Sequence, residues 1–83
     1  MRYLIMCRSL TYAQKSAALL ERHGIASGIS KAPAGLSGRG CAYSITVSEQ
    51  NGAKAVQILR NANLLYGKVY EQSEGNTYRE AEL

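Results

Sequence analysis

The chain has 83 residues, enough for one hydrophobic core and for a single domain. Hydrophobic residues make up 46% of it, a share typical of a globular domain and too high for a disordered chain. No apolar stretch could cross a bilayer and no cleavable leader follows Met1, so we expect a cytoplasmic protein with no membrane partner. The formal charge is +4, but the ten Lys and Arg are scattered, which is typical of a solvated surface rather than of a nucleic-acid-binding one.

The first half of the chain predicts a strand and then a helix. Residues 2–7 are apolar and too few for a helix, so they indicate a buried strand. Thr11 and Gln14 have the spacing of a capping box, which predicts a helix that starts there and runs to about His23. Gly24 then stands where a left-handed helix cap is needed.

Two further strands flank a glycine-rich loop. Residues 25–31 predict a strand that Gly28 interrupts. Residues 32–40 hold three glycines and a proline, so they form a loop. Residues 41–47 alternate between apolar and small polar side chains, which predicts a strand with Tyr43 on its core face.

The last third predicts a helix, a strand and a polar tail. Ser48 is a good N-cap for a helix that runs to about Ala62, and Asn63 is a left-handed stop. A strand follows at 67–72. Residues 73–83 are polar, and we expect a frayed, flexible tail outside the domain.

The order strand–helix–strand–strand–helix–strand predicts an α+β domain of the split βαβ, ferredoxin-like kind over residues 1–72. Such a domain has a four-stranded antiparallel sheet with both helices on one face. Right-handed crossovers place the first and third strands side by side and antiparallel. The end of the first strand then meets the start of the third, so we expect Cys7, Arg8 and Cys41 at one edge of the sheet.

Cys41 is the residue with the most specific chemistry. It follows the glycine-rich loop 32–40, whose candidate residues are Pro33, Gly35, Gly38 and Gly40. Arg39, Arg8 and a nearby helix N-terminus would favour the thiolate form of Cys41. A thiolate can hold a sulfur or selenium atom as a persulfide-type adduct. The alternative is that Cys41 is a small buried residue on the core face of its strand.

The other candidates give weaker signals. Cys7 is either a core residue or, if close to Cys41, a resolving thiol. The ligands are too few for a metal site, and no motif indicates a cofactor. His23 suits the end of a helix, and no Ser/His/Asp set or carboxylate pair is present, so we expect a carrier or binding module rather than an enzyme.

Two non-carrier functions stay open. Residues 39–43 partly follow the RNA-binding pattern of an RRM, but Cys41 and Thr46 stand where aromatic residues should be, and Tyr43 is predicted on the core face. We therefore do not expect nucleic acid as the partner. The other function is a protein-interaction module that forms a homodimer through the open sheet face, where Ala42, Ser44 and Thr46 are small.

The chain resembles a family of small bacterial proteins described as selenium/sulfur carrier-like. The resemblance covers about residues 2–72. It rests on the first strand at 3–6, the helix at 13–20 running into His23-Gly24-Ile25, Pro33 with the loop that ends in Cys41, and the helix at 55–59 followed by Gly67-Lys-Val-Tyr70. It implies a cysteine that carries sulfur or selenium, which maps onto Cys41, together with donor and acceptor proteins as partners. The family usually has Ser-Ser before this cysteine and Gly after it, where this chain has Arg39-Gly40 and Ala42.

Overall fold

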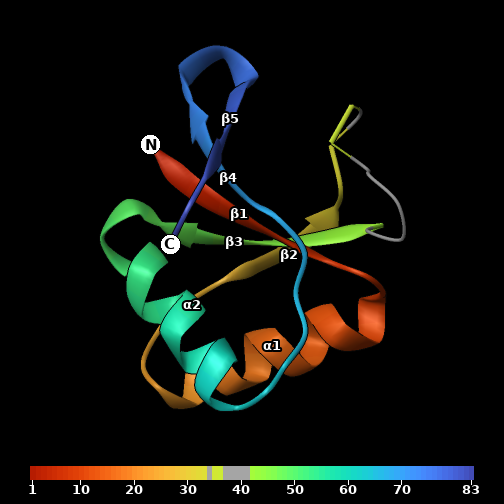
Figure 1. Ribbon diagram of the computed structural model, residues 1–83, viewed down its shortest axis with the longest axis vertical. Helices are drawn as coiled ribbons and strands as arrows, with labels where there is room; N and C mark the ends of the chain where they lie inside the picture. Colours follow the sequence, from red (N-terminus) through yellow and green to blue (C-terminus); the bar gives the residue numbers. More distant parts are fainter. Residues whose placement is uncertain (34, 37–41) are drawn as a thin grey trace.

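The computed structural model describes residues 1–33, 35–36 and 42–83, and it places two helices on one face of a five-stranded antiparallel sheet (Figure 1). The elements are β1 (Arg2–Cys7), α1 (Leu10–Arg22), β2 (Gly28–Lys31), β3 (Tyr43–Ser48), the 3₁₀ turn η1 (Glu49–Asn51), α2 (Gly52–Asn61), β4 (Val69–Ser73), the 3₁₀ turn η2 (Glu74–Asn76) and β5 (Thr77–Ala81). Across the described residues, neither helix has the length and apolar character needed to cross a membrane.

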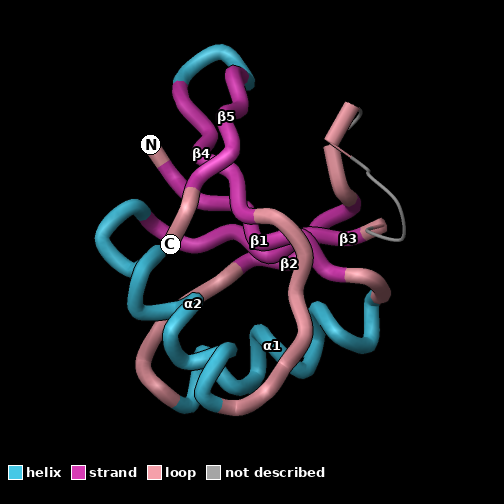
Figure 2. Tube along the Cα trace, viewed as in Figure 1, coloured by secondary structure: helices cyan, strands magenta, loops and turns pink. Residues whose placement is uncertain are grey.

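The strand order in the sheet is β2-β3-β1-β4-β5, and every neighbouring pair is antiparallel (Figure 2). The predicted adjacency of the first and third strands is confirmed, because β1 pairs with β3 along its whole length. The predicted number of four strands is wrong. The segment expected to be a frayed tail contains β5, which pairs with β4 from Ser73 opposite Thr77 to Val69 opposite Ala81. Gly75, at φ 73°, lets the chain turn back for this pairing.

Helix α1 begins two residues earlier than the capping-box spacing predicted. Ser9 is its N-cap, with an extended backbone at φ −144°, and its hydroxyl accepts a hydrogen bond from the Tyr12 amide at 3.3 Å. Thr11 lies inside the helix, so the predicted capping box is wrong. The predicted end is confirmed, because His23 is the C-cap and Gly24 has φ 79°.

Helix α2 follows the turn η1, whose N-cap is Ser48. The predicted left-handed stop is confirmed, because Asn63 has φ 57°. At the other end of the helix, Gly52 fills a close approach to β1: a Cβ added there would lie 2.2 Å from Cδ2 of Tyr3. No larger residue fits between α2 and this ring without displacing it.

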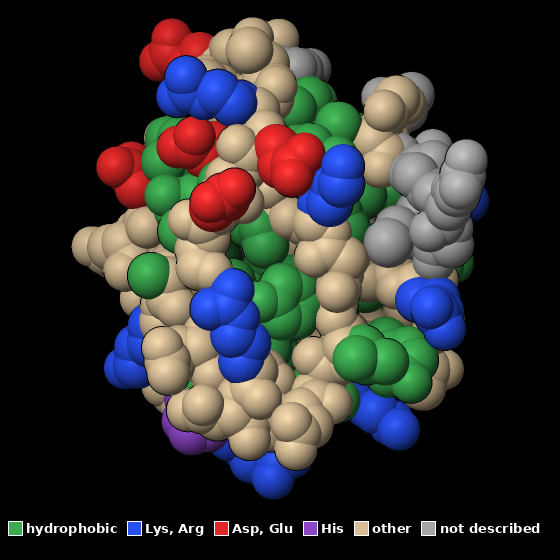
Figure 3. Space-filling model, viewed as in Figure 1, with side chains coloured by type: hydrophobic (Ala, Val, Ile, Leu, Met, Phe, Trp, Pro, Cys, Tyr) green, Lys and Arg blue, Asp and Glu red, His purple; other side chains and the backbone are tan. Residues whose placement is uncertain are grey.

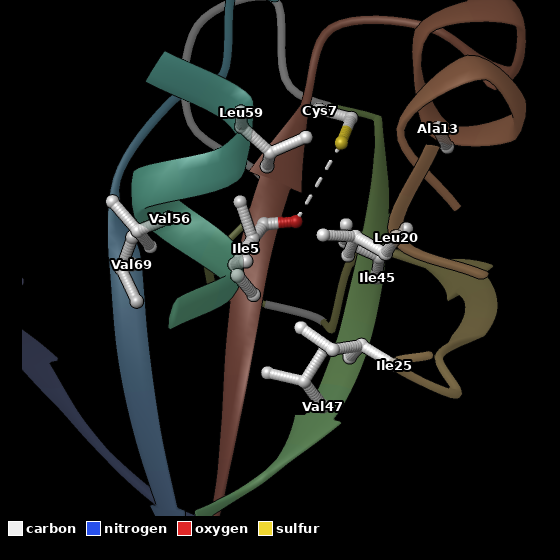
Figure 4. Close-up of a cluster of buried hydrophobic side chains, with 11 residues drawn as sticks. Ile5, Cys7, Ala13, Leu20, Ile25, Ile45, Val47, Val56, Leu59 and Val69 are labelled. Carbon is white, nitrogen blue, oxygen red and sulfur yellow. Dashed lines mark hydrogen bonds between the residues drawn. The ribbon is translucent and has the colours of Figure 1, made fainter. Parts of the chain in front are cut away.

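The core lies between the sheet and the helices. It includes Ile5, Ile45, Val47, Leu20, Val56 and Leu59, which converge in Figure 4. The other face of the sheet is less open than predicted. Leu4 and Met6 are buried there, and Ser44 is fully buried rather than exposed, while Thr46 is half-buried and Ala42 exposed.

Candidate functional site

Cys7 is part of the hydrophobic core. It is the last residue of β1, it lies on the helix side with Ile5, and it is 0% exposed. Its thiol donates to the Ile5 carbonyl oxygen at 3.7 Å (Figure 4). Its placement as a core residue is confirmed. A role as a resolving thiol stays a prediction.

Cys41, Arg39, Gly38 and Gly40 lie outside the described residues, so their predicted roles are not tested by the structure. The chain on either side is described. The Ala32 amide donates to the Ala42 carbonyl oxygen at 2.9 Å, which extends the β2–β3 ladder by one step beyond Lys31 and Tyr43.

Three strand ends meet at this point. Tyr43 is paired with Cys7 of β1 on one side and with Lys31 of β2 on the other. The predicted meeting of the end of the first strand with the start of the third is therefore confirmed. We call this region, formed by Cys7, Arg8, Ser9, Lys31, Ala42 and Tyr43, the β1–β3 end of the sheet.

A turn begins the loop that leaves β2. The Leu36 amide donates to the Pro33 carbonyl oxygen at 3.0 Å, and Gly35 has φ 88°. This positive φ is available to glycine at low cost and is strained for other residues. Pro33 is half-buried at the start of the same turn.

The β1–β3 end is positively charged in its described part. Arg8 and Lys31 are exposed, and neither forms an ion pair with any described residue. The N-terminus of α1 adds the positive end of the helix dipole, with no acidic residue in its first turn. Acidic side chains gather instead over β4 and β5 (Figure 3). The positive charge at the β1–β3 end favours the thiolate form of a cysteine placed there over its thiol form.

Lys31 was missed by the sequence reasoning. It is the last residue of β2, and only the register of β2 on β3 places it opposite Tyr43. The signal that could have found it is its position directly before the glycine-rich loop. Without the register, it was one of ten scattered basic residues.

Tyr43 is half-buried and packs against the core, as the alternation predicted. An RRM would need this ring on the opposite face of the sheet, where bases stack. The RNA-binding alternative therefore loses the one aromatic residue on which its pattern depended. Among the described residues, no group of three or more His, Cys, Asp or Glu could hold a metal ion.

Comparison with known proteins identifies a family for this chain. A family model described as "Putative Se/S carrier protein-like" matches residues 2–71. The chain belongs to this family. A search of curated proteins and a search of solved structures each gave no match. The match runs from the start of β1 into β4, where it ends at Glu71, and it includes the glycine-rich loop and the position of Cys41.

Proposed function

We propose that this protein is a thiol-based carrier of sulfur or selenium, with Cys41 as the acceptor. The observation that carries the proposal is membership of the Se/S carrier-like family over residues 2–71. The β1–β3 end of the sheet supports it, because Ala42 is bonded directly to residue 41 and the described surroundings are cationic. We also interpret β1–β4 with the two helices as a ferredoxin-like core to which β5 is added at one edge.

The proposed transfer needs no external oxidant or reductant. The Cys41 thiolate attacks the outer sulfur of a persulfide on a donor protein. The donor's S–S bond breaks as a new S–S bond forms on Cys41, and the donor leaves as a thiolate. A thiolate on an acceptor protein then attacks the same sulfur and releases Cys41. Selenium would follow the same steps with Se in place of the outer S.

The neighbours of Cys41 have separate roles in this proposal. Arg39 and Arg8 stabilise the thiolate between transfers, together with the N-terminus of α1. Loop 32–40 shields the adduct from water and from other thiols. Lys31 adds to the positive potential at the end of β2, where it also attracts an anionic persulfide.

Intact mass spectrometry tests the acceptor directly. The protein is incubated with a cysteine desulfurase and cysteine, and we expect a gain of one sulfur atom that a reductant removes. Cys41→Ser should abolish the gain. Cys7→Ala is the matched control, and it should keep the gain because Cys7 is buried in the core.

Two outcomes of the mass measurement would contradict the carrier function. Wild-type protein that stays at its original mass with the active desulfurase, or a gain that follows Cys7 instead of Cys41, would contradict the proposal. The first outcome favours a protein-interaction module in which Cys41 is structural.

A further inference from the structure

Strand β2 is an edge strand, and no other strand of the described residues lies along its outer side. All four of its residues, Gly28–Lys31, are exposed, and its one neighbour in the sheet is β3. Two of the four large apolar side chains that are exposed among the described residues, Leu10 and Ile29, lie on this side of the molecule, at 41% and 40% exposure. An exposed strand edge with unpaired backbone groups is a template for pairing with another strand.

The backbone groups that point away from β3 can be identified. Ala32 is hydrogen-bonded to its partner Ala42, and hydrogen-bonded pairs alternate with non-bonded pairs along an antiparallel ladder. Gly28 and Ser30 therefore turn their amides and carbonyls toward β3. Ile29 and Lys31 turn theirs outward, where they can bond another strand.

One flank of α1 extends this edge. Residues Ala13, Ser16 and Leu20 face the core, and the stripe Leu10, Gln14, Ala17 and Glu21 is the next one around the helix. Helix α1 contacts β3 and β2, and α2 on its other side. Because the helix is right-handed and runs back along the sheet from β1 to β2, this stripe faces the β2 edge, whereas Tyr12 and Leu19 face α2.

We propose that two copies of this chain pair antiparallel through their β2 edges, with a two-fold axis near Ile29. The two five-stranded sheets then form one continuous sheet. Ile29 of each copy lies opposite Ile29 of the other, and the outward amides and carbonyls are satisfied. The α1 flanks meet beneath this seam, so Leu10 and Ala17 lose contact with water.

Charge complementarity supports a second copy of the chain as the partner of the β2 edge. Glu21 lies in the last turn of α1, and five residues, 23–27, connect that helix to β2. The Ile25 amide is bonded to the Leu20 carbonyl oxygen at 2.9 Å, so the chain turns back toward the sheet at the helix end that carries Glu21. Lys31 lies at the other end of β2. The two-fold axis brings Lys31 of each copy to Glu21 of the other, and neither side chain has an ion pair among the described residues of its own chain.

The other edge of the sheet is protected against pairing. Strand β5 carries Arg79 and Glu80 on opposite faces, and each is already paired within the chain, with Glu71 and Lys68. Charged side chains on an edge strand disfavour addition of another strand. Pairing through the β2 edges does not involve the chemistry of Cys41, so the dimer and the carrier function can each be disproved separately.

Sedimentation equilibrium over a range of concentrations tests the pairing. We expect a weak dimer, with a dissociation constant on the order of micromolar. Ile29→Lys should raise that constant about tenfold or more, because it places two charges opposite each other at the axis. Leu65→Lys is the matched control, since Leu65 is also exposed, at 66%, but lies away from β2; it should leave the constant unchanged.

A charge exchange tests the pairing of Lys31 with Glu21. Glu21→Lys and Lys31→Glu should each weaken the dimer, and the double variant should restore it, with circular dichroism showing that each variant folds. A monomer at all concentrations, or a dimer insensitive to Ile29→Lys, overturns the proposal. A dimer that Thr46→Lys breaks while Ile29→Lys does not would assign the open sheet face instead.

Discussion

Ser16 carries a buried hydroxyl that makes no hydrogen bond within the described part of the chain. Its side chain is 0% exposed on the inner face of α1, and its Oγ has no partner among those residues. A buried polar atom without a partner loses its bonds to water and gains nothing in return. Ser16→Ala should therefore stabilise the protein by about 1 kcal/mol, helped by the higher helix propensity of alanine.

Urea unfolding measures this difference, with Ser30→Ala as the control. The Ser30 hydroxyl lies 3.4 Å from that of Ser44, within hydrogen-bonding distance, so its removal should not stabilise the protein. A lower stability for Ser16→Ala would show that its hydroxyl has a partner in solution.

Substitution of Gly52 by alanine should have the opposite effect on stability from Ser16→Ala. An added Cβ would come within 2.2 Å of Cδ2 and 2.5 Å of Cε2 of Tyr3, so the ring would have to move out of its place between β1 and α2. We expect Gly52→Ala to destabilise the protein by about 1–3 kcal/mol despite the helix propensity of alanine. In the same urea assay, Gly28→Ala should change stability by less than about 0.5 kcal/mol, because no atom of the described residues lies within 4 Å of its added Cβ. Equal effects of the two substitutions would rule out the Tyr3 contact as the cause.

At the scale of the elements, the start of α1 gives a direct test of its cap. Ser9→Ala should cost about 1 kcal/mol of stability, because it removes the acceptor for the Tyr12 amide. Thr11→Ala should change stability by less than about 0.5 kcal/mol, since Thr11 is exposed within the first turn. Thermal unfolding of both variants measures the difference in their stability. A larger loss for Thr11→Ala than for Ser9→Ala would identify Thr11 as the N-cap.

The two candidate N-caps of α1, Ser9 and Thr11, show how far the local sequence determines where a helix begins. A hydroxyl at Ser9 and one at Thr11 both have plausible spacing, and local chemistry alone does not separate them. The length of β1 decides: the strand ends at Cys7 opposite Tyr43, so the chain is free to turn into a helix at once. The positive φ values of Gly24 and Asn63 were predictable, because few residues adopt that conformation at low cost.

For the whole molecule, β5 joins the sheet to the end of α2. Arg60 of α2 donates from Nε to the Tyr66 hydroxyl at 2.8 Å and from Nη2 to the carbonyl oxygen of Leu83, just beyond β5. Gln72, almost fully buried on β4, donates to the Tyr78 hydroxyl of β5 at 3.2 Å. These contacts connect residues that were expected to be a frayed tail with the centre of the domain.

Deletion of residues 74–83 should therefore lower the free energy of unfolding by an amount on the order of 2 kcal/mol, because it exposes the edge of β4 and the buried Gln72. Denaturant unfolding measures the loss. Arg60→Ala is the matched control, since it removes the contacts of Arg60 with Leu83 and Tyr66 but leaves the pairing of β4 with β5, and it should cost less. A deletion variant as stable as the full chain would show that these residues add nothing to the domain.

The order of the two helices and the first four strands could be predicted from the sequence, as could the side of β3 that Tyr43 occupies, because those features depend on periodicity and on residues with restricted backbone angles. The bounds were less predictable, since β2 begins at Gly28 rather than at the predicted residue 25. The family resemblance also came from the sequence, since the matched motifs are local. The tertiary structure was needed to find that β5 exists, that Ser44 is buried and that Lys31 lies opposite Tyr43. These features depend on pairing between residues far apart in the chain, where a polar strand such as β5 is stabilised by backbone hydrogen bonds to its neighbour rather than by any pattern of its own.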